Sequence, residues 1–202
     1  MKFCLFGLVF LIISLKVAGQ ADYIIRINDT VINIALDKPY NIKVKGENVQ
    51  LIVKLKDTLT YSKSFFSFLY TKNYKVAQSK IENGIDQITI LTANGSGILI
   101  QKYETLNPTN LKELMLTEVT KESINYGFKE TRTTYIKKLA TGQEVEVTKA
   151  ELTYKDEVNI YEIATIGKKD AGLIVVTIKM DNNATSDGQK VIDLMWASLK
   201  VK

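Results

Sequence analysis

The stretch "GLIVVTIKM", residues 172–180, decides the fold expected for this chain. From Leu173 to Ile178 it is almost continuously apolar, with little alternation between apolar and polar positions. Because successive side chains of a strand point to opposite faces of the sheet, this run predicts a strand that is buried on both faces. The second face therefore needs a cover of its own.

The C-terminal stretch "TSDGQKVIDLMWASLKVK", residues 185–202, is predicted to supply that cover as a helix. Ser186 and Gln189 have the spacing of a capping box, which marks a helix start. One helical face then carries Val191, Met195 and Leu199, with Ile192 and Trp196 beside them. We interpret Trp196 as the core anchor of this helix, and ligand stacking as the lesser alternative.

Residues 128–180 are predicted to form an antiparallel meander of four strands, with turns at 140–142, 155–157 and 167–172. In the second strand, Val145 and Val147 are in odd phase, whereas Ala150 and Leu152 are in even phase. One of the two pairs would face solvent unless the register changes, so a β-bulge near Thr148–Lys149 is expected.

Upstream, residues 85–103 predict a hairpin and residues 107–127 a helix. Asn94-Gly95 is a tight-turn signal, and the residues that follow it are predicted to form a strand. A Gly-rich loop that binds phosphate would instead lead into the N-terminus of a helix, so we interpret this loop as a turn. Asn107 or Thr109 can cap the helix, Pro108 suits its first turn and Gly127 its end. Its apolar face is predicted to hold Leu111, Leu114, Met115 and Val119.

Residues 22–62 are predicted to be an N-terminal β-hairpin appendage, with a polar linker at 57–63. The main domain, 63–202, would start with an aromatic strand in which Phe66, Phe68 and Tyr70 share a face. The expected fold class is α+β.

Residues 1–19, with Lys2 and a 13-residue apolar block from Phe3 to Leu15, are predicted to be a secretory signal peptide, and an uncleaved anchor is the alternative.

The composition excludes several chemistries. The chain has no histidine, and its one cysteine, Cys4, lies within the predicted signal peptide, so the mature protein lacks imidazole bases, thiol nucleophiles and His/Cys zinc sites. The net charge of +5 falls to +3 when Lys2 and Lys16 leave. The remaining cations are scattered, which disfavours nucleic-acid binding. No cofactor and no transmembrane segment of the mature chain are expected.

Two groups of residues are candidates for a site. Tyr103, Tyr126 and Tyr135, with Arg132 and Lys137, could line a wet groove between sheet and helix; half-buried structural tyrosines are the alternative. Asp181, Asn183 and Asp187 space oxygen ligands in a loop like the first half of a calcium loop, but Ile192 stands where the bidentate glutamate is needed. A solvated connection is the alternative interpretation of that loop.

From Ser64 onward, the order of elements resembles the PsbP/Mog1/DcrB group of proteins. The resemblance rests on "FSFLY", the hairpin "QITILTANGSGILIQKY", the helix start "NPTNLKEL", the apolar "GLIVVTIKM" and the closing "LMWASLKV". It implies an α/β/α sandwich, in which helices cover both faces of a twisted antiparallel sheet. The group consists mostly of non-catalytic accessory or binding proteins. The lack of histidine means that metal roles of some plant members do not carry over.

We therefore expect an exported, non-enzymatic accessory or binding protein of the bacterial envelope, periplasmic or secreted, with an envelope protein as its partner. One alternative is a small-ligand binder, or an enzyme based on carboxylates and tyrosines, in a sheet–helix cleft. The other is a β-rich module that pairs through an edge strand of residues 22–56. The oligomeric state stays open.

Overall fold

The computed structural model describes residues 23–202, so the predicted signal peptide lies outside the described residues. The chain divides into two compact units, one ending at Leu55 and the other spanning Lys56–Lys202. The sequence-based boundary after residue 62 is therefore seven residues too late. Each unit is described by itself.

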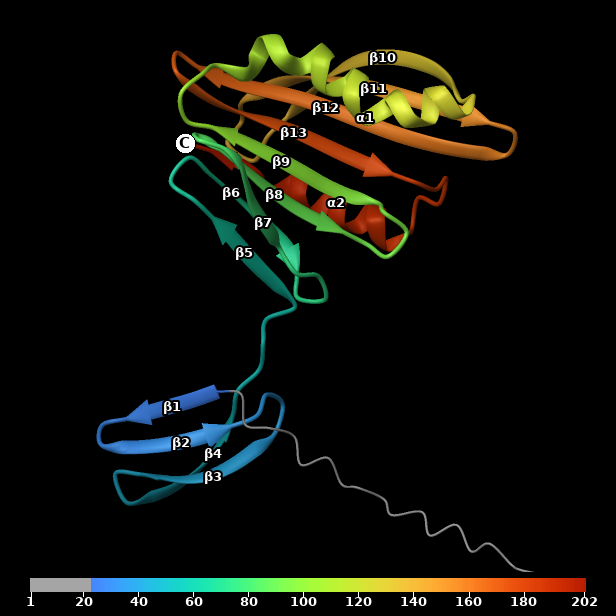
Figure 1. Cartoon of the computed structure of the whole chain (residues 1–202). Helices are drawn as coiled ribbons and strands as arrows, with labels where there is room; N and C mark the ends of the chain where they lie inside the picture. The colour runs from blue at the N-terminus through green and yellow to red at the C-terminus, as the bar shows by residue number, and fades with distance from the viewer. Residues whose placement is uncertain (1–22) are drawn as a thin grey trace, which may run out of the picture. The chain divides into compact units, whose positions relative to one another are not determined.

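In the N-terminal unit, two hairpins form two separate two-stranded antiparallel sheets (Figure 1). The strands are β1 (Tyr23–Ile27), β2 (Thr30–Ile34), β3 (Pro39–Val44) and β4 (Glu47–Ile52). Asn28, in the turn of the first hairpin, has a φ of 52°. The second turn uses Lys45 and Gly46, with φ values of 51° and 87°, because a two-residue primed turn needs positive φ at both positions.

The larger unit is built on a seven-stranded antiparallel sheet in the order β10-β11-β12-β13-β9-β8-β7. Its strands are β7 (Ala77–Glu82), β8 (Ile85–Leu91), β9 (Gly97–Tyr103), β10 (Lys129–Lys138), β11 (Glu144–Tyr154), β12 (Glu157–Lys168) and β13 (Ala171–Lys179). The meander and the β8–β9 hairpin predicted from the sequence are confirmed. Only Gly95, not Asn94, has positive φ in that hairpin loop, which spans Thr92 to Ser96.

A second sheet of three strands contains β5 (Thr58–Ser62), β6 (Phe66–Thr71) and β14 (Lys200–Val201). The predicted linker at 57–63 is therefore wrong. The stretch "TLTYS" alternates polar and larger side chains, and its threonines and tyrosine favour a strand. Tyr61 is 7% exposed, and its ring stacks on that of Phe68 with centroids 5.2 Å apart.

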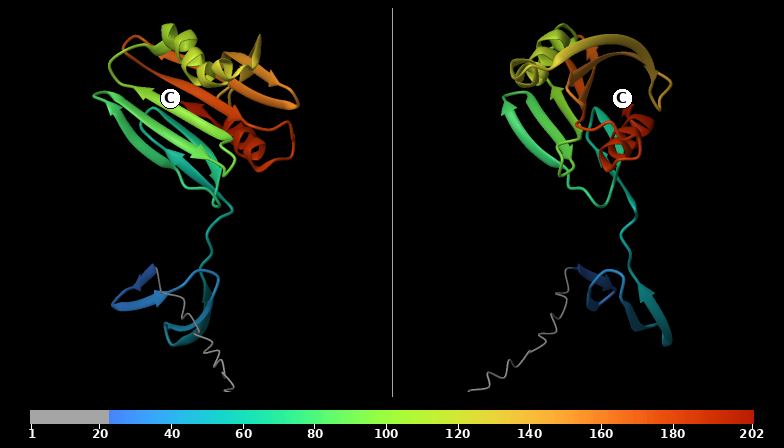
Figure 2. Two further views of the ribbon diagram at one scale, coloured as in Figure 1. Left: turned by 45° about the vertical axis from the view of Figure 1, so that its right-hand side comes forward. Right: turned by 90° about the vertical axis from the view of Figure 1, so that its right-hand side faces the viewer.

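Strand β13 is buried on both faces, as its composition predicts. Leu173 and Val175 belong to one hydrophobic core, while Ile174 and Val176 belong to the other. The second core lies under helix α1 (Lys112–Tyr126), which follows the 3₁₀-helix η1 (Pro108–Leu111) and crosses one face of the sheet (Figure 1). The first core lies on the opposite face, under helix α2 (Asp187–Ser198) and strands β5 and β6 (Figure 2).

Helix α1 ends at the predicted Gly127, and three of the four residues predicted for its apolar face, Leu111, Met115 and Val119, pack against the core under the helix. Asn107 caps η1 by accepting a hydrogen bond from the Thr109 N–H, and Gly127 ends α1 with a φ of 113°. Leu114, predicted to be buried, is 60% exposed, whereas Leu116 is fully buried. Thr120 is buried as well, and its hydroxyl donates to the Leu116 carbonyl, so the burial leaves no unpaired donor.

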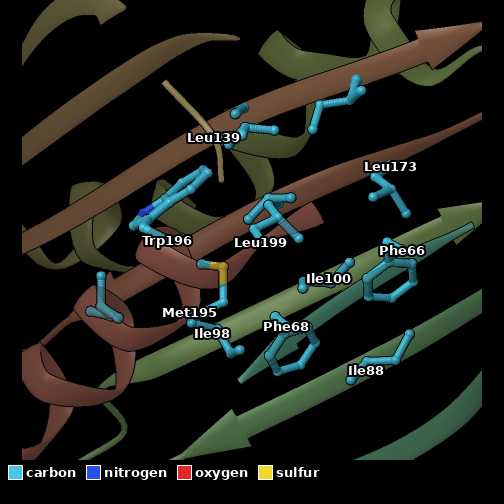
Figure 3. Close-up of a cluster of buried hydrophobic side chains, with 14 of the residues drawn as sticks. Phe66, Phe68, Ile88, Ile98, Ile100, Leu139, Leu173, Met195, Trp196 and Leu199 are labelled. Atoms are coloured by element: carbon cyan, nitrogen blue, oxygen red, sulfur yellow. The ribbon is translucent and has the colours of Figure 1, made fainter. Parts of the chain in front are cut away.

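Helix α2 begins at the predicted cap, where the Ser186 side chain accepts from the Gln189 N–H. Its Met195 points into the core beside Ile98 and Phe68 (Figure 3), and Trp196, which belongs to the same core, is 3% exposed. The core-anchor interpretation of Trp196 is confirmed. On this face the strands β5 and β6 share the cover of the sheet with α2, an addition that the sequence did not predict.

Strand β11 contains no bulge, since its register with β10 and with β12 is continuous. Its two apolar phases are buried on opposite faces of the sheet. Val145 and Val147 pack in the α2-side core, whereas Ala150 and Leu152 pack in the α1-side core. The strand passes from one core to the other, so no register change is needed.

Candidate functional site

The five predicted groove residues do not gather at one place. Tyr135 and Lys137 of β10 do meet, on the α2 side. The Lys137 ammonium lies 4.9 Å from the centroid of the Trp196 ring and 5.7 Å from that of Tyr135. Two favourable cation–π contacts thus hold the Lys137 ammonium near the rings of Trp196 and Tyr135.

The other three residues lie elsewhere. Arg132 contacts the α1 side, where its guanidinium lies 2.9 Å from carboxylate oxygens of both Glu113 and Glu130. Tyr103 is buried in the α1-side core, and its hydroxyl donates to Gln101 at 2.7 Å. Tyr126 ends α1 and is 70% exposed. The five residues therefore do not line one common groove.

The three candidate metal ligands use their oxygens in local contacts. Asp181 accepts hydrogen bonds from the Asn94 amide and from the Asn183 backbone N–H. Asn183 in turn accepts from Thr185. Asp187 pairs with Lys190 at 2.9 Å, and this ammonium is the main cause that lowers the pKa of the Asp187 carboxyl. Within residues 23–202, no group of three or more acidic, cysteine or histidine side chains is placed to hold a metal ion.

A polar pocket that sequence reasoning missed lies between the sheet and α2. Its volume is about 170 Å³, and three strands and the helix line it. The lining residues are Lys149, Ile160, Glu162, Thr177, Lys179, Gln189 and Ile192. They come from β11, β12, β13 and the first turns of α2, so the pocket exists only when the register of three strands is set.

Glu162 is the half-buried carboxylate of this pocket. Its Oε1 accepts a hydrogen bond of 2.6 Å from the Tyr135 hydroxyl, and its Oε2 accepts one of 3.2 Å from Thr177. Burial first, and then this bond to Glu162, raise the pKa of the Tyr135 phenol well above its usual value. Both donors are neutral hydroxyls. Among the described residues, no Lys or Arg nitrogen lies within 4 Å of a carboxylate oxygen of Glu162.

Two lysines share the pocket with Glu162. The Lys149 ammonium is already 2.8 Å from a carboxylate oxygen of Glu151. Lys179, half-buried at the end of β13, forms no ion pair with any residue in the described part of the chain. The pocket therefore holds one carboxylate and one ammonium that lack ionic partners.

The N-terminal unit contains a larger and more apolar groove of about 710 Å³. It is lined by Ile27, Asn28, Asp29, Thr30, Ile32, Asn41, Ile42, Lys43, Val44 and Lys45. Among residues 23–55, Ile34 is the only large apolar side chain that is buried, while Ile24 and Val31 are 69% and 51% exposed. No helix within residues 23–202 has the length and apolar character needed to span a membrane.

Comparison with solved structures finds proteins of similar fold. The chain is similar to the solution structure of cyanobacterial PsbP (CyanoP) from Synechocystis sp. PCC 6803, at 12% identity and a TM-score of 0.46. The match covers 74% of this chain and 95% of that protein. No protein-family model matches the sequence, and a search of curated proteins finds no match. At this level of similarity, no activity follows from the likeness.

Proposed function

We propose that this is an exported, non-enzymatic accessory protein that binds an extended apolar segment of an envelope protein through residues 23–55. The observation that carries the proposal is the groove of about 710 Å³ between the two hairpins of this unit. It falls within the range of about 300–1,000 Å³ that is common for binding sites.

The size of the unit supports a binding role. Chains shorter than about 40 residues usually need disulfides, metals or association to be stable, and residues 23–55 contain no cysteine and no histidine. Each of the four strands belongs to a two-stranded sheet, so each has one edge without a strand partner. Isolated hairpins are marginally stable, and an added strand would satisfy a free edge.

The groove also suggests the chemistry of its partner. The lining of the groove includes the apolar side chains of Ile27, Ile32, Ile42 and Val44, and also Lys43 and Lys45. A bound segment in extended conformation would place apolar side chains against this lining at every second position, because strand side chains alternate. The absence of imidazole and thiol groups after Cys4 supports binding rather than catalysis by these groups.

Site-specific photo-crosslinking in the native host tests the proposal. A photoreactive residue at Ile42, in the groove, is expected to give one discrete product of higher mass. The same residue at Lys121 on α1, whose side chain is 59% exposed, serves as the control and should give none. Products confined to residues 56–202 of the same chain, or no product from Ile42, would refute binding of a partner. Mass spectrometry of the N-terminus tests export.

A further inference from the structure

We propose that the polar pocket between α2 and strands β11–β13 binds a small zwitterion of the amino-acid class, with its ammonium at Glu162 and its carboxylate at Lys179. This inference is independent of the function proposed for residues 23–55. It rests on two unpaired opposite charges that line one cavity of about 170 Å³.

The register of the sheet places the two charges close to each other without making them direct cross-strand partners. Glu162 is paired with Thr177 across β12 and β13, and Ile160 is paired with Lys179. Glu162 and Lys179 are thus diagonal neighbours, which lie about 7–8 Å apart at the backbone. Hydrogen bonds from Tyr135 and Thr177 also hold the carboxylate of Glu162. A ligand that carries both charges can reach both partners at once.

The remaining lining limits the ligand further. Because Lys149 is already paired with Glu151, Lys179 is the ammonium left for a ligand carboxylate. Ile160 and Ile192 add apolar walls suited to a short aliphatic side chain. The volume is below the range of about 300–1,000 Å³ of pockets for drug-sized molecules, which favours glycine or alanine over an aromatic amino acid.

A simple anion and a simple cation fit less well. An anion at Lys179 would approach the negative charge of Glu162, and a cation at Glu162 would approach Lys179 and Lys149. Like charges held close together in a partly buried site repel each other. In a zwitterion the attraction of the second charge offsets each of these repulsions. The pocket should therefore discriminate alanine from propionate, which lacks the ammonium, and from ethylamine, which lacks the carboxylate.

The test is a titration of the mature chain, followed by amide chemical shifts in ¹H–¹⁵N spectra. L-Alanine is expected to give saturable shifts at residues 160–162, 177–179 and 189–192, with at least tenfold weaker binding of propionate and of ethylamine. Glu162→Gln, which keeps an acceptor for Tyr135, should weaken alanine binding at least tenfold without weakening that of propionate. Lys179→Gln should weaken alanine and propionate alike.

Lys121→Gln, on the exposed side of α1, is the matched control and should leave all three affinities unchanged. Spectral dispersion reports whether each variant stays folded. Because Lys179 makes no ion pair within the described chain, its substitution keeps the test valid even if Glu162→Gln unfolds. Equal binding of propionate and alanine, or no saturable shift with any of the three compounds, would overturn the proposal.

Discussion

The hydroxyl of Tyr135 on β10 donates a 2.6 Å hydrogen bond to Glu162 on β12, across the intervening strand β11. This bond links the strand that curves over α2 to the carboxylate of the polar pocket (Figure 2). It also joins a residue that the sequence suggested as functional to one that it did not reveal.

Tyr135→Phe should lower the free energy of unfolding at pH 7 by about 1–2 kcal/mol, because a hydrogen bond to a charged group is lost. Urea unfolding measures this. Tyr126→Phe, at a position that is 70% exposed, is the control and should change it by less than about 0.5 kcal/mol. Equal losses in the two variants would contradict a stabilising role of the bond.

The same variant makes a prediction about pH. Burial and Glu162 raise the pKa of the folded-state phenol of Tyr135 above the ordinary value of 10.0 for tyrosine. Below pH 10 the phenol is protonated in both the folded and the unfolded state. Above pH 10 the phenol ionises in the unfolded state but stays protonated in the folded state. The free energy of unfolding therefore falls by up to about 1.4 kcal/mol per pH unit. The stability difference between wild type and Tyr135→Phe should therefore shrink between pH 10 and 11. A constant difference would contradict the raised pKa.

The unit boundary predicts the behaviour of two fragments. Fragment 56–202 should unfold as cooperatively as the same unit in the whole chain. Fragment 63–202, which follows the sequence-based boundary, lacks β5 and therefore Tyr61, which stacks on Phe68. Its free energy of unfolding should be lower by at least about 3 kcal/mol, since a buried aromatic side chain is removed. Equal stability of the two fragments in urea would show that β5 is not part of this unit.

The sequence predicted the buried segments of the fold best. The apolar run of β13 predicted two covered faces, and the periodicity of α2 predicted one of the covers, because burial leaves a pattern that one segment carries by itself. Strand β7 was missed since all six of its residues are exposed at the sheet edge and show no alternation. In β11, apolar residues in both alternation phases led to the prediction of a bulge. The sequence does not show that the two faces of this strand pack against two different cores.

The pocket could not be predicted for a different reason. Lys149, Glu162 and Thr177 are adjacent only through the pairing of three strands, and each is an ordinary polar residue in its own strand. The sequence did draw attention to Tyr135, but as one member of a larger set that the fold separates. Register, rather than composition, creates this site, and register follows from the whole sheet.

Trp196 is the only tryptophan of the chain and is 3% exposed, yet its indole N–H has no hydrogen-bond acceptor among the described residues. Trp196→Ala should cost about 3–5 kcal/mol, as large-to-small changes in a core do. Trp196→Phe should cost less than half as much, because it keeps an aromatic ring and removes the unpaired donor. Urea unfolding followed by circular dichroism measures both. Equal costs would contradict this account, because the ring that Phe retains would then recover no stability.

Gly97, the first residue of β9, should be the least replaceable glycine of the β8–β9 hairpin. Its φ is 149°, and a Cβ there would lie 2.0 Å from the Ile90 carbonyl oxygen, which belongs to the backbone of β8 and cannot move without breaking the strand pair. Gly97→Ala should therefore lower the free energy of unfolding by at least about 3 kcal/mol. Gly142→Ala is the matched control: its φ is 85°, but its nearest neighbour, the Lys138 Cε, is 3.9 Å away. It should cost only the left-handed backbone penalty of about 1–2 kcal/mol. If urea unfolding gave similar losses for both, the close approach of β8 to Gly97 would not be what constrains this position.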